Sequence, residues 1–414
     1  MFSNSAQNLQ GAPQIAVMKG LAAVRKRADM YIGNTADGTG LHNIVFKVCD
    51  LTLEEVLACV ATEVSDTLNA DGSASVRDDG RGMPTGVDPV AAISMPELLM
   101  TQLSAGGISG GDSGGGCIVP GGVHTAGVSV VNALSSRLDL RIWRDGTEHI
   151  VRFRDGIADA PLAVVGPAGG RHGTEITFWP SPSMFCKAVD FDYDTLERRL
   201  HEMAAFCPRA RIVLNDHRPG GRRQQRICLS GIADLLRYLD RVRKPLLEAP
   251  ITIVSDEGGN RAGLSFEVAL WWNDSPPGHL ACYAETLPLR SGGTLLAGIR
   301  AAVGRAITRY AQQHDDADRE KVQIIGDDAR SGLTAVVAIW NIGPSFQTDL
   351  DDADLPERLS VGERYCIESV VADRLSTWLD AHPTQAQAIL ANVRKAASGR
   401  AICDFVQRSP TTRS

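Results

Sequence analysis

The spacing of apolar residues along the chain of 414 residues predicts helices and strands in both halves. Apolar positions three or four residues apart favour amphipathic helices, and apolar positions at every second residue favour strands. The predicted helices span residues 18–27, 41–62, 97–103, 128–134, 193–205, 294–313 and 363–406. The predicted strands span residues 73–77, 138–144, 149–154, 175–178, 210–215, 264–272 and 333–339.

Local composition divides the chain further. Residues 106–127 contain ten glycines, which is typical of a mobile loop. The stretch 218–223 combines turn-forming and basic residues, and it predicts a domain boundary near 220–230. We therefore expect a flexible N-terminal arm over 1–15, a first domain over 16–225, a second domain over 226–400 and a C-terminal tail over 401–414.

Bulk composition excludes several classes of protein. A hydrophobic content of 43% and a charged content of 22% are ordinary for packed domains, so wholesale disorder is excluded. The net charge of −7 argues against a general nucleic-acid coat. Nine cysteines without a C-x-x-C pair predict reduced thiols. Met1–Gln14 lacks a signal pattern and no run of 18 apolar residues occurs, so we expect a soluble, cytoplasmic protein without membrane contact.

One run of residues limits the possible functions of the chain more than any other feature. It reads Asp-Asp-Gly-Arg-Gly-Met-Pro at 78–84, directly after a predicted strand. Other anchors follow in a fixed order: Met-Tyr-Ile-Gly at 30–33, Gly-Thr-Gly-Leu-His at 38–42, Gly-Val-Ser-Val-Val-Asn-Ala-Leu at 127–134, Gly-Thr at 173–174 and Gly-Asp-Asp-Ala-Arg-Ser-Gly-Leu at 326–333. Over about residues 17–400 the chain resembles the N-terminal half of bacterial DNA gyrase B and of its topoisomerase IV counterpart.

This resemblance implies an α+β fold. The first domain is expected to be a GHKL (Bergerat) α/β sandwich of the ATPase type, and the second a transducer domain of the ribosomal-protein type. In this family the two belong to a clamp that closes as a dimer when ATP binds. The parts that cleave DNA lie in a later domain and in another subunit, so we expect no DNA cleavage by this chain alone.

The resemblance also assigns the adenine half of a nucleotide site for ATP or ADP. Asp78 matches the aspartate that accepts a proton of the adenine amine. Thr174 matches the threonine that helps to hold the base. The remaining matches, in the base pocket, its rim and the glycine cradle, are Arg81, Gly82, Met83, Pro84, Arg144 and Gly127.

The phosphate half departs from the family. The position of the catalytic base holds Lys47, and the position of the magnesium ligand holds Leu51. A spacing of four residues places both on one face of the predicted helix. A protonated lysine cannot act as a general base, and leucine has no oxygen for Mg²⁺. Glu54 and Glu55 lie roughly 10–12 Å along the helix from Lys47 and are too far away to replace the base. We therefore predict no catalytic residue and no family-type Mg²⁺ binding.

Four further differences from the family concern the lid at Ile108, the glycine cradle at Thr125, the phosphate-sensing loop at Asp349 and the N-terminal arm. Ile108 stands where the family has a lysine, Thr125 where it has a glycine, and Asp349 where it has a lysine. The first tyrosine of the chain is Tyr31, so the arm lacks the tyrosine that the family inserts into its partner. Together these changes favour a degenerate relative that has kept the base pocket and lost the means of hydrolysis.

Three functions remain open from the sequence. The first is a pseudo-ATPase that acts by binding a topoisomerase partner, a nucleotide or a gyrase inhibitor. The second is the ATP-hydrolysing module of a divergent type IIA topoisomerase. The third is a DNA-binding clamp, for which a solvated basic face is the simpler interpretation. Both a homodimer and a hetero-pair with a gyrase or topoisomerase chain are open. The basic residues that suggest DNA are Arg222, Arg223, Arg226, Arg300, Arg305 and Arg309.

Overall fold

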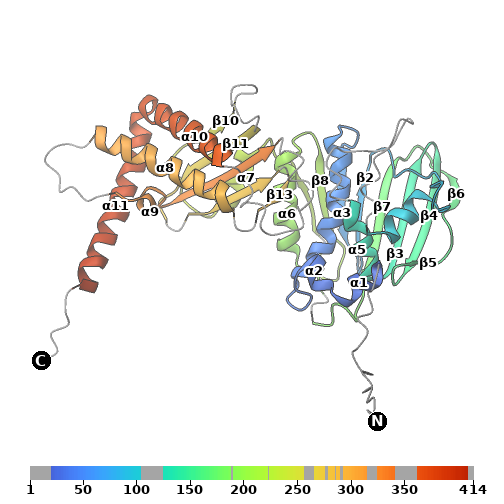
Figure 1. The fold of residues 1–414 in the computed structure, drawn as a ribbon. Helices are drawn as coiled ribbons and strands as arrows, with labels where there is room; N and C mark the ends of the chain where they lie inside the picture. The colour runs from blue at the N-terminus through green and yellow to red at the C-terminus, as the bar shows by residue number, and fades with distance from the viewer. Residues whose placement is uncertain are drawn as a thin grey trace, which may run out of the picture.

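The chain folds into two lobes that lie side by side, each built on its own β-sheet (Figure 1). The computed structural model describes residues 20–103, 125–187, 190–221, 223–255, 265–275, 278–284, 286–289, 292–314, 324–340 and 361–408. The arm, the lid with Ile108, and the sensing loop with Asp349 lie outside these residues. Helices and strands are mixed in both lobes, and the predicted α+β class is confirmed.

The first lobe contains a sheet in the order β5-β4-β3-β7-β2-β1-β8-β9, with β6 also paired to β4. β1 and β8 are parallel, and the other neighbours are antiparallel. The strands are β1 (Glu63–Leu68), β2 (Ala74–Asp78), β3 (Ser135–Arg144), β4 (Thr147–Arg154), β5 (Ile157–Ala158), β6 (Ala163–Pro167), β7 (Gly173–Pro180), β8 (Arg211–Asp216) and β9 (Arg223–Ile227). The helices are α1 (Leu21–Lys26), α2 (Ala28–Ile32), α3 (Thr39–Leu57), α4 (Met95–Thr101), α5 (Thr125–Ala133) and α6 (Tyr193–Phe206).

One face of this sheet carries the core, because its strands alternate. In β1, Val64, Asp66 and Leu68 point inward and are buried, whereas Ser65 and Thr67 are only half-buried. Helix α3 covers that inner face and packs against both α5 and the strands β1, β2 and β7. Helix α3, which carries part of the candidate site, is thereby held against both the sheet and α5.

The second lobe contains a sheet in the order β10-β11-β14-β12-β13. Its strands are β10 (Ile251–Val254), β11 (Ser265–Trp272), β12 (Leu280–Ala284), β13 (Leu287–Pro288) and β14 (Leu333–Trp340). Its helices are α7 (Ile232–Leu239), α8 (Gly293–Gln313), α9 (Gly326–Ala329), α10 (Val361–Ala381) and α11 (Pro383–Arg408). β14 is buried from Leu333 to Ile339 without alternation, as expected for a strand with both faces covered.

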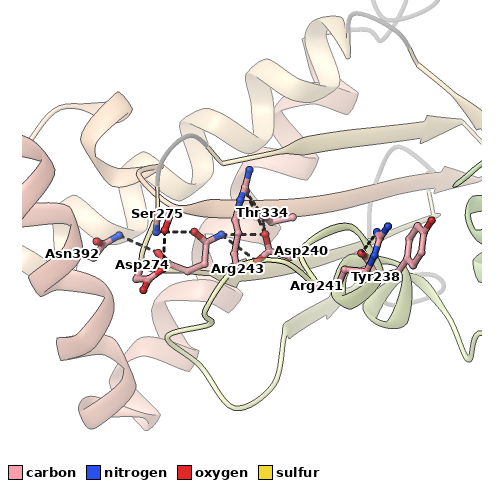
Figure 2. Close-up of polar contacts among 9 residues, drawn as sticks. Tyr238, Asp240, Arg241, Arg243, Asp274, Ser275, Thr334 and Asn392 are labelled. Carbon is pink, nitrogen blue, oxygen red and sulfur yellow. Dashed lines mark hydrogen bonds and ion pairs between the residues drawn. The ribbon is translucent and has the colours of Figure 1, made fainter. Parts of the chain in front are cut away.

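A buried polar network ties α7 to the ends of two strands in this lobe (Figure 2). The Asp240 carboxylate, 2% exposed, accepts hydrogen bonds from Thr334 Oγ1 at 3.0 Å and from Asn273 Nδ2 at 3.1 Å. Arg243 approaches the same carboxylate at 3.3 Å, and Asn392 of α11 donates to the Asn273 carbonyl at 3.4 Å. Because this buried charge has partners, the network is structural.

Helix α6 contributes to the cores of both lobes. Leu196, Leu200 and Met203 pack in the first core, whereas Ala205 is buried in the second. In Figure 1 this helix lies between the two sheets. The predicted boundary at 225/226 falls within β9, which still pairs with β8 of the first sheet.

Many predicted elements have somewhat different limits in the structure, and three of them are instructive. The helix expected to reach residue 62 ends at Leu57, because Cys59 takes a left-handed backbone conformation at φ 58° and β1 begins at Glu63. The helical C-terminal segment expected at 363–406 consists of two helices, and Pro383 is the first residue of the second. The short helix expected at 97–103 is α4, capped at its start by Ser94 and Glu97.

Other elements were not predicted at all, among them α2, β1, α7, β10 and β12. In the ranges that the structure describes, no helix has the length and hydropathy to cross a membrane.

Candidate nucleotide site

The residues predicted to hold the base gather where β2 and β7 lie side by side. Asp78 is the last residue of β2, and Thr174 is the second residue of β7. Oδ1 of Asp78 accepts from the Gly80 amide at 2.8 Å and the Thr174 amide at 3.4 Å. Oδ2 of Asp78 accepts no hydrogen bond from the described residues, so this oxygen can accept one from a ligand.

Thr174 organises the loop that follows Asp78. Its Oγ1 accepts a hydrogen bond from the Met83 amide at 2.9 Å, which leaves the hydroxyl proton for another acceptor. Met83 is 7% exposed and Pro84 is half-buried, so the loop presents an apolar surface beside the two polar groups. A planar heterocycle with one amine donor matches this combination of groups.

Two glycines allow the close approach of the backbone segments here. Gly82 has φ +79°, and a Cβ there would lie 2.7 Å from the Trp143 carbonyl oxygen. Gly173 has φ +109°, and a Cβ there would lie 2.1 Å from the Asp78 carbonyl oxygen. Any other residue would be strained at both positions and would separate the strand ends.

The two predicted rim arginines have different partners: Arg144 contacts the loop after Asp78, and Arg81 of that loop contacts Glu55 on α3. Arg144 Nη1 donates to the Gly82 carbonyl at 2.6 Å. Arg81 Nη2 pairs with Glu55 Oε1 at 2.9 Å, and the Arg81 amide donates to Glu55 Oε2 at 3.0 Å. From the sequence, Glu55 was weighed only as a substitute base, and its role in fixing the rim was missed. His172, also missed, contacts the Gly80 carbonyl through Nδ1 at 3.1 Å.

The two positions of α3 that the resemblance assigns to the catalytic base and the metal ligand carry no carboxylate. Lys47 and Leu51 are both half-buried on α3, and Leu51 packs against the first core. A Cβ on Gly127 of α5 would lie only 3.2–3.5 Å from the Lys47 side-chain carbons Cβ, Cγ and Cδ. The aliphatic part of the Lys47 side chain therefore packs against Gly127, the third residue of α5. Thr125 is the first residue of α5, and its side chain lies outside the described part.

The donor set does not fit a magnesium site of the family type. Leu51 supplies no oxygen, and Lys47 brings a positive charge to the place where a cation would lie. Among the described residues no three His, Cys, Asp or Glu side chains form a metal-binding group. Asp50, between the two positions, pairs instead with Arg199 Nη2 at 3.4 Å.

Burial shifts the protonation of three carboxyl groups in this lobe. Burial raises the pKa of Asp78 to about 7, and the negative charges of Glu55 and Asp79 add to this effect. Burial also raises the pKa of Glu54 on α3 to about 7. Asp66 on β1 has its pKa raised by burial to about 7, and its Oδ2 has no partner among the described residues. Asp78 alone of the three belongs to the base pocket.

The basic residues that suggested DNA binding are only partly available. Arg300, Arg305 and Arg309 are exposed on α8, but Arg305 forms an ion pair with Glu368 of α10. The Arg223 guanidinium lies 5.5 Å from the ring centre of Tyr193, and Arg222 lies outside the described residues.

The chain is similar to known proteins over almost all of its length. The family model for DNA gyrase B matches residues 231–402. DNA gyrase B of Caulobacter vibrioides is 41% identical over 411 residues, which cover 97% of this chain and 50% of that protein. DNA gyrase B of Rickettsia felis is 38% identical over 391 residues, which cover 94% of this chain and 47% of that protein. The chain belongs to the DNA gyrase B family.

Solved structures of this family share the whole two-lobed fold. The 43K ATPase domain of Thermus thermophilus gyrase B, in complex with an aminocoumarin, matches 95% of the chain with a TM-score of 0.69 and 29% identity, and 99% of that domain is covered. The ATP-binding domain of Francisella tularensis topoisomerase IV, with a small-molecule inhibitor, matches 92% with a TM-score of 0.66, 28% identity and 98% coverage. The gyrase B relatives are longer, and the chain spans about half their length.

Proposed function

We propose that the chain is a nucleotide-binding module of the gyrase B type that does not hydrolyse ATP and acts by binding. The base pocket supports binding, since Asp78 Oδ2 and the Thr174 hydroxyl proton are both available beside the apolar surface of Met83. The observation that carries the proposal is the pair Lys47 and Leu51 on α3. These positions would have to activate water and hold the metal, and neither side chain can do so.

The proposal predicts that nucleotide binding is independent of Mg²⁺. Calorimetric titrations of ATP, ADP and an aminocoumarin, each with and without Mg²⁺, test this directly. We expect the three ligands to bind with affinities that Mg²⁺ leaves unchanged within about twofold. Asp78→Ala should abolish binding, because it removes the acceptor for the base. An affinity for ATP that rises tenfold or more with Mg²⁺ would contradict the proposal.

Turnover provides a second test. We expect no ATP hydrolysis above background, since loss of a general base alone typically costs about 10²–10⁴ in rate. The triple change Lys47→Glu, Leu51→Asn and Ile108→Lys should recover little turnover, because Asp349 and the arm without tyrosine remain. Turnover by the unmodified chain that Asp78→Ala abolishes would refute the pseudo-ATPase assignment.

The alternative function, an ATP-hydrolysing module of a divergent type IIA topoisomerase, is favoured by the complete base pocket. It predicts that a non-hydrolysable ATP analogue drives dimerisation, which size-exclusion chromatography with light scattering can detect. A chain whose mass does not change with the analogue would exclude this function.

The proposed partner is a gyrase or topoisomerase chain, held either in a hetero-pair or through a homodimer of this chain. Mixing the chain with such proteins and measuring complex mass tests both forms. Direct DNA binding is the weaker proposal, and it predicts an affinity that falls steeply with salt. Absence of DNA binding at low salt would remove it.

A further inference from the structure

One buried arginine joins three elements where the two lobes meet. Arg199 lies in α6 and is 6% exposed. Its Nη2 pairs with Oδ1 of Asp50 on α3 at 3.4 Å, and its Nη1 lies 3.2 Å from Oε2 of Glu202 on α6. Nη1 also donates to the carbonyl oxygen of Thr286, which directly precedes β13 of the second lobe, at 3.2 Å. A single guanidinium therefore contacts the first lobe, the shared helix and the second lobe.

Aromatic contacts along α6 join the same two lobes. The His201 ring on α6 stacks on the Tyr238 ring on α7, with centroids 3.7 Å apart and planes at 8°. Phe206, at the end of α6, packs at 5.0 Å against Tyr283 of β12 and at 6.5 Å against Trp340 of β14. Arg199 is itself buried, and the low local dielectric strengthens its electrostatic interactions.

The chemistry of the bridge makes it rigid. A guanidinium holds its five N–H donors in one plane and stays charged, so its acceptors must keep fixed relative directions. Rotation of one lobe against the other would separate Arg199 from either Asp50 or the Thr286 carbonyl. A buried charge that loses its partner is strongly disfavoured.

We propose that the bridge Asp50–Arg199–Thr286 fixes the angle between the two lobes and couples α3 mechanically to the second lobe. Asp50 lies between Lys47 and Leu51 on α3, so a displacement of the phosphate-facing helix is transmitted through Arg199 to the segment before β13. Arg199 is a positioning residue in this scheme. The coupling does not depend on nucleotide binding, and its test is independent of the proposed function.

The test uses a double variant that carries both Arg199→Met and Asp50→Asn. These changes break the bridge without leaving the Asp50 charge buried, and the double variant is compared with the unmodified chain. Arg198→Met is the matched control, since Arg198 is the exposed neighbour on the same helix. Scanning calorimetry and small-angle X-ray scattering are measured on all three proteins. We expect one unfolding transition in the unmodified chain and the control. The double variant should show two transitions and a broader distribution of interatomic distances.

A double variant with one transition and an unchanged scattering curve would overturn the proposal. If the double variant does not fold, native-state hydrogen exchange on the unmodified chain tests instead whether the two lobes are coupled. Amides of α3 near Asp50 and amides of β14 should then open in one cooperative step with the same dependence on denaturant. Separate openings with different dependences would show that the two lobes are not coupled.

Discussion

The raised pKa of Asp78 gives nucleotide recognition a defined pH dependence. The amine of adenine donates a hydrogen bond, so the pocket binds it best when Asp78 is ionised and acts only as an acceptor. With a pKa of about 7, roughly one-eleventh of the protein is ionised at pH 6 and roughly ten-elevenths at pH 8. The dissociation constant for the base should therefore be about tenfold lower at pH 8 than at pH 6, a difference of about 1.4 kcal/mol.

Adenosine is the appropriate ligand for this measurement, because it carries no phosphate that titrates between pH 6 and 8. Its dissociation constant is measured at both pH values by calorimetry or by NMR titration. At pH 6 the binding should also release close to one proton, which two buffers with different ionisation enthalpies reveal. Asp78→Asn serves as the control, with weaker binding by about 1.5–3 kcal/mol and no dependence on pH.

Two results would refute this reasoning. A dissociation constant that changes by less than about twofold between pH 6 and 8 would mean that the ionisation of Asp78 is not coupled to recognition. Stronger binding at pH 6 would mean that the protonated carboxyl is the form that contacts the base. The first result would refute the titration of Asp78 between pH 6 and 8, and the second would refute the role of its ionised form as an acceptor for the amine.

Two further predictions concern stability. Asp66→Val should stabilise the chain by up to about 4 kcal/mol at pH 8 and by far less at pH 4. The Asp66 carboxyl has a pKa of about 7 in the folded state against 3.8 in the unfolded state, so the folded state loses stability as the pH rises between these values, and the valine variant does not. Urea unfolding at both pH values tests this, and equal gains in stability at the two pH values would contradict it. Gly173→Ala should destabilise the folded chain by about 2–4 kcal/mol, because the φ of +109° and the Asp78 carbonyl leave no space for a Cβ. The control Gly86→Ala, where a Cβ would lie in open space, should change stability by less than about 0.5 kcal/mol. A thermal melt of Gly173→Ala that matches that of the unmodified chain would refute the argument.

The residues that the sequence assigns to the base side lie close together in the structure, and part of the signal for them is local. A strand that runs into Asp78, followed by glycines and an apolar pair, specifies a tight loop at one strand end. The structure brings Asp78 and Thr174 together through the pairing of β2 with β7.

The missed features depend on contacts between distant residues. Arg199 and Asp50 are separated by 149 residues, and no local pattern marks either as a partner of the other. Strand β1 was missed because Asp66 places a carboxyl group at an inward position and breaks the apolar alternation that would have revealed it. The early end of α3 was missed because Cys59 adopts a positive φ although it is not glycine.

The division of α6 between two cores constrains how this architecture can change over generations. A gene exchange at the end of the first sheet would separate Ala205 and Phe206 from the apolar residues they cover. The recipient protein would then expose a hydrophobic seam on the imported half. A break before Tyr193 would open the first core in turn, because Leu196, Leu200 and Met203 of the same helix pack there, so a successful recombination must carry both lobes together.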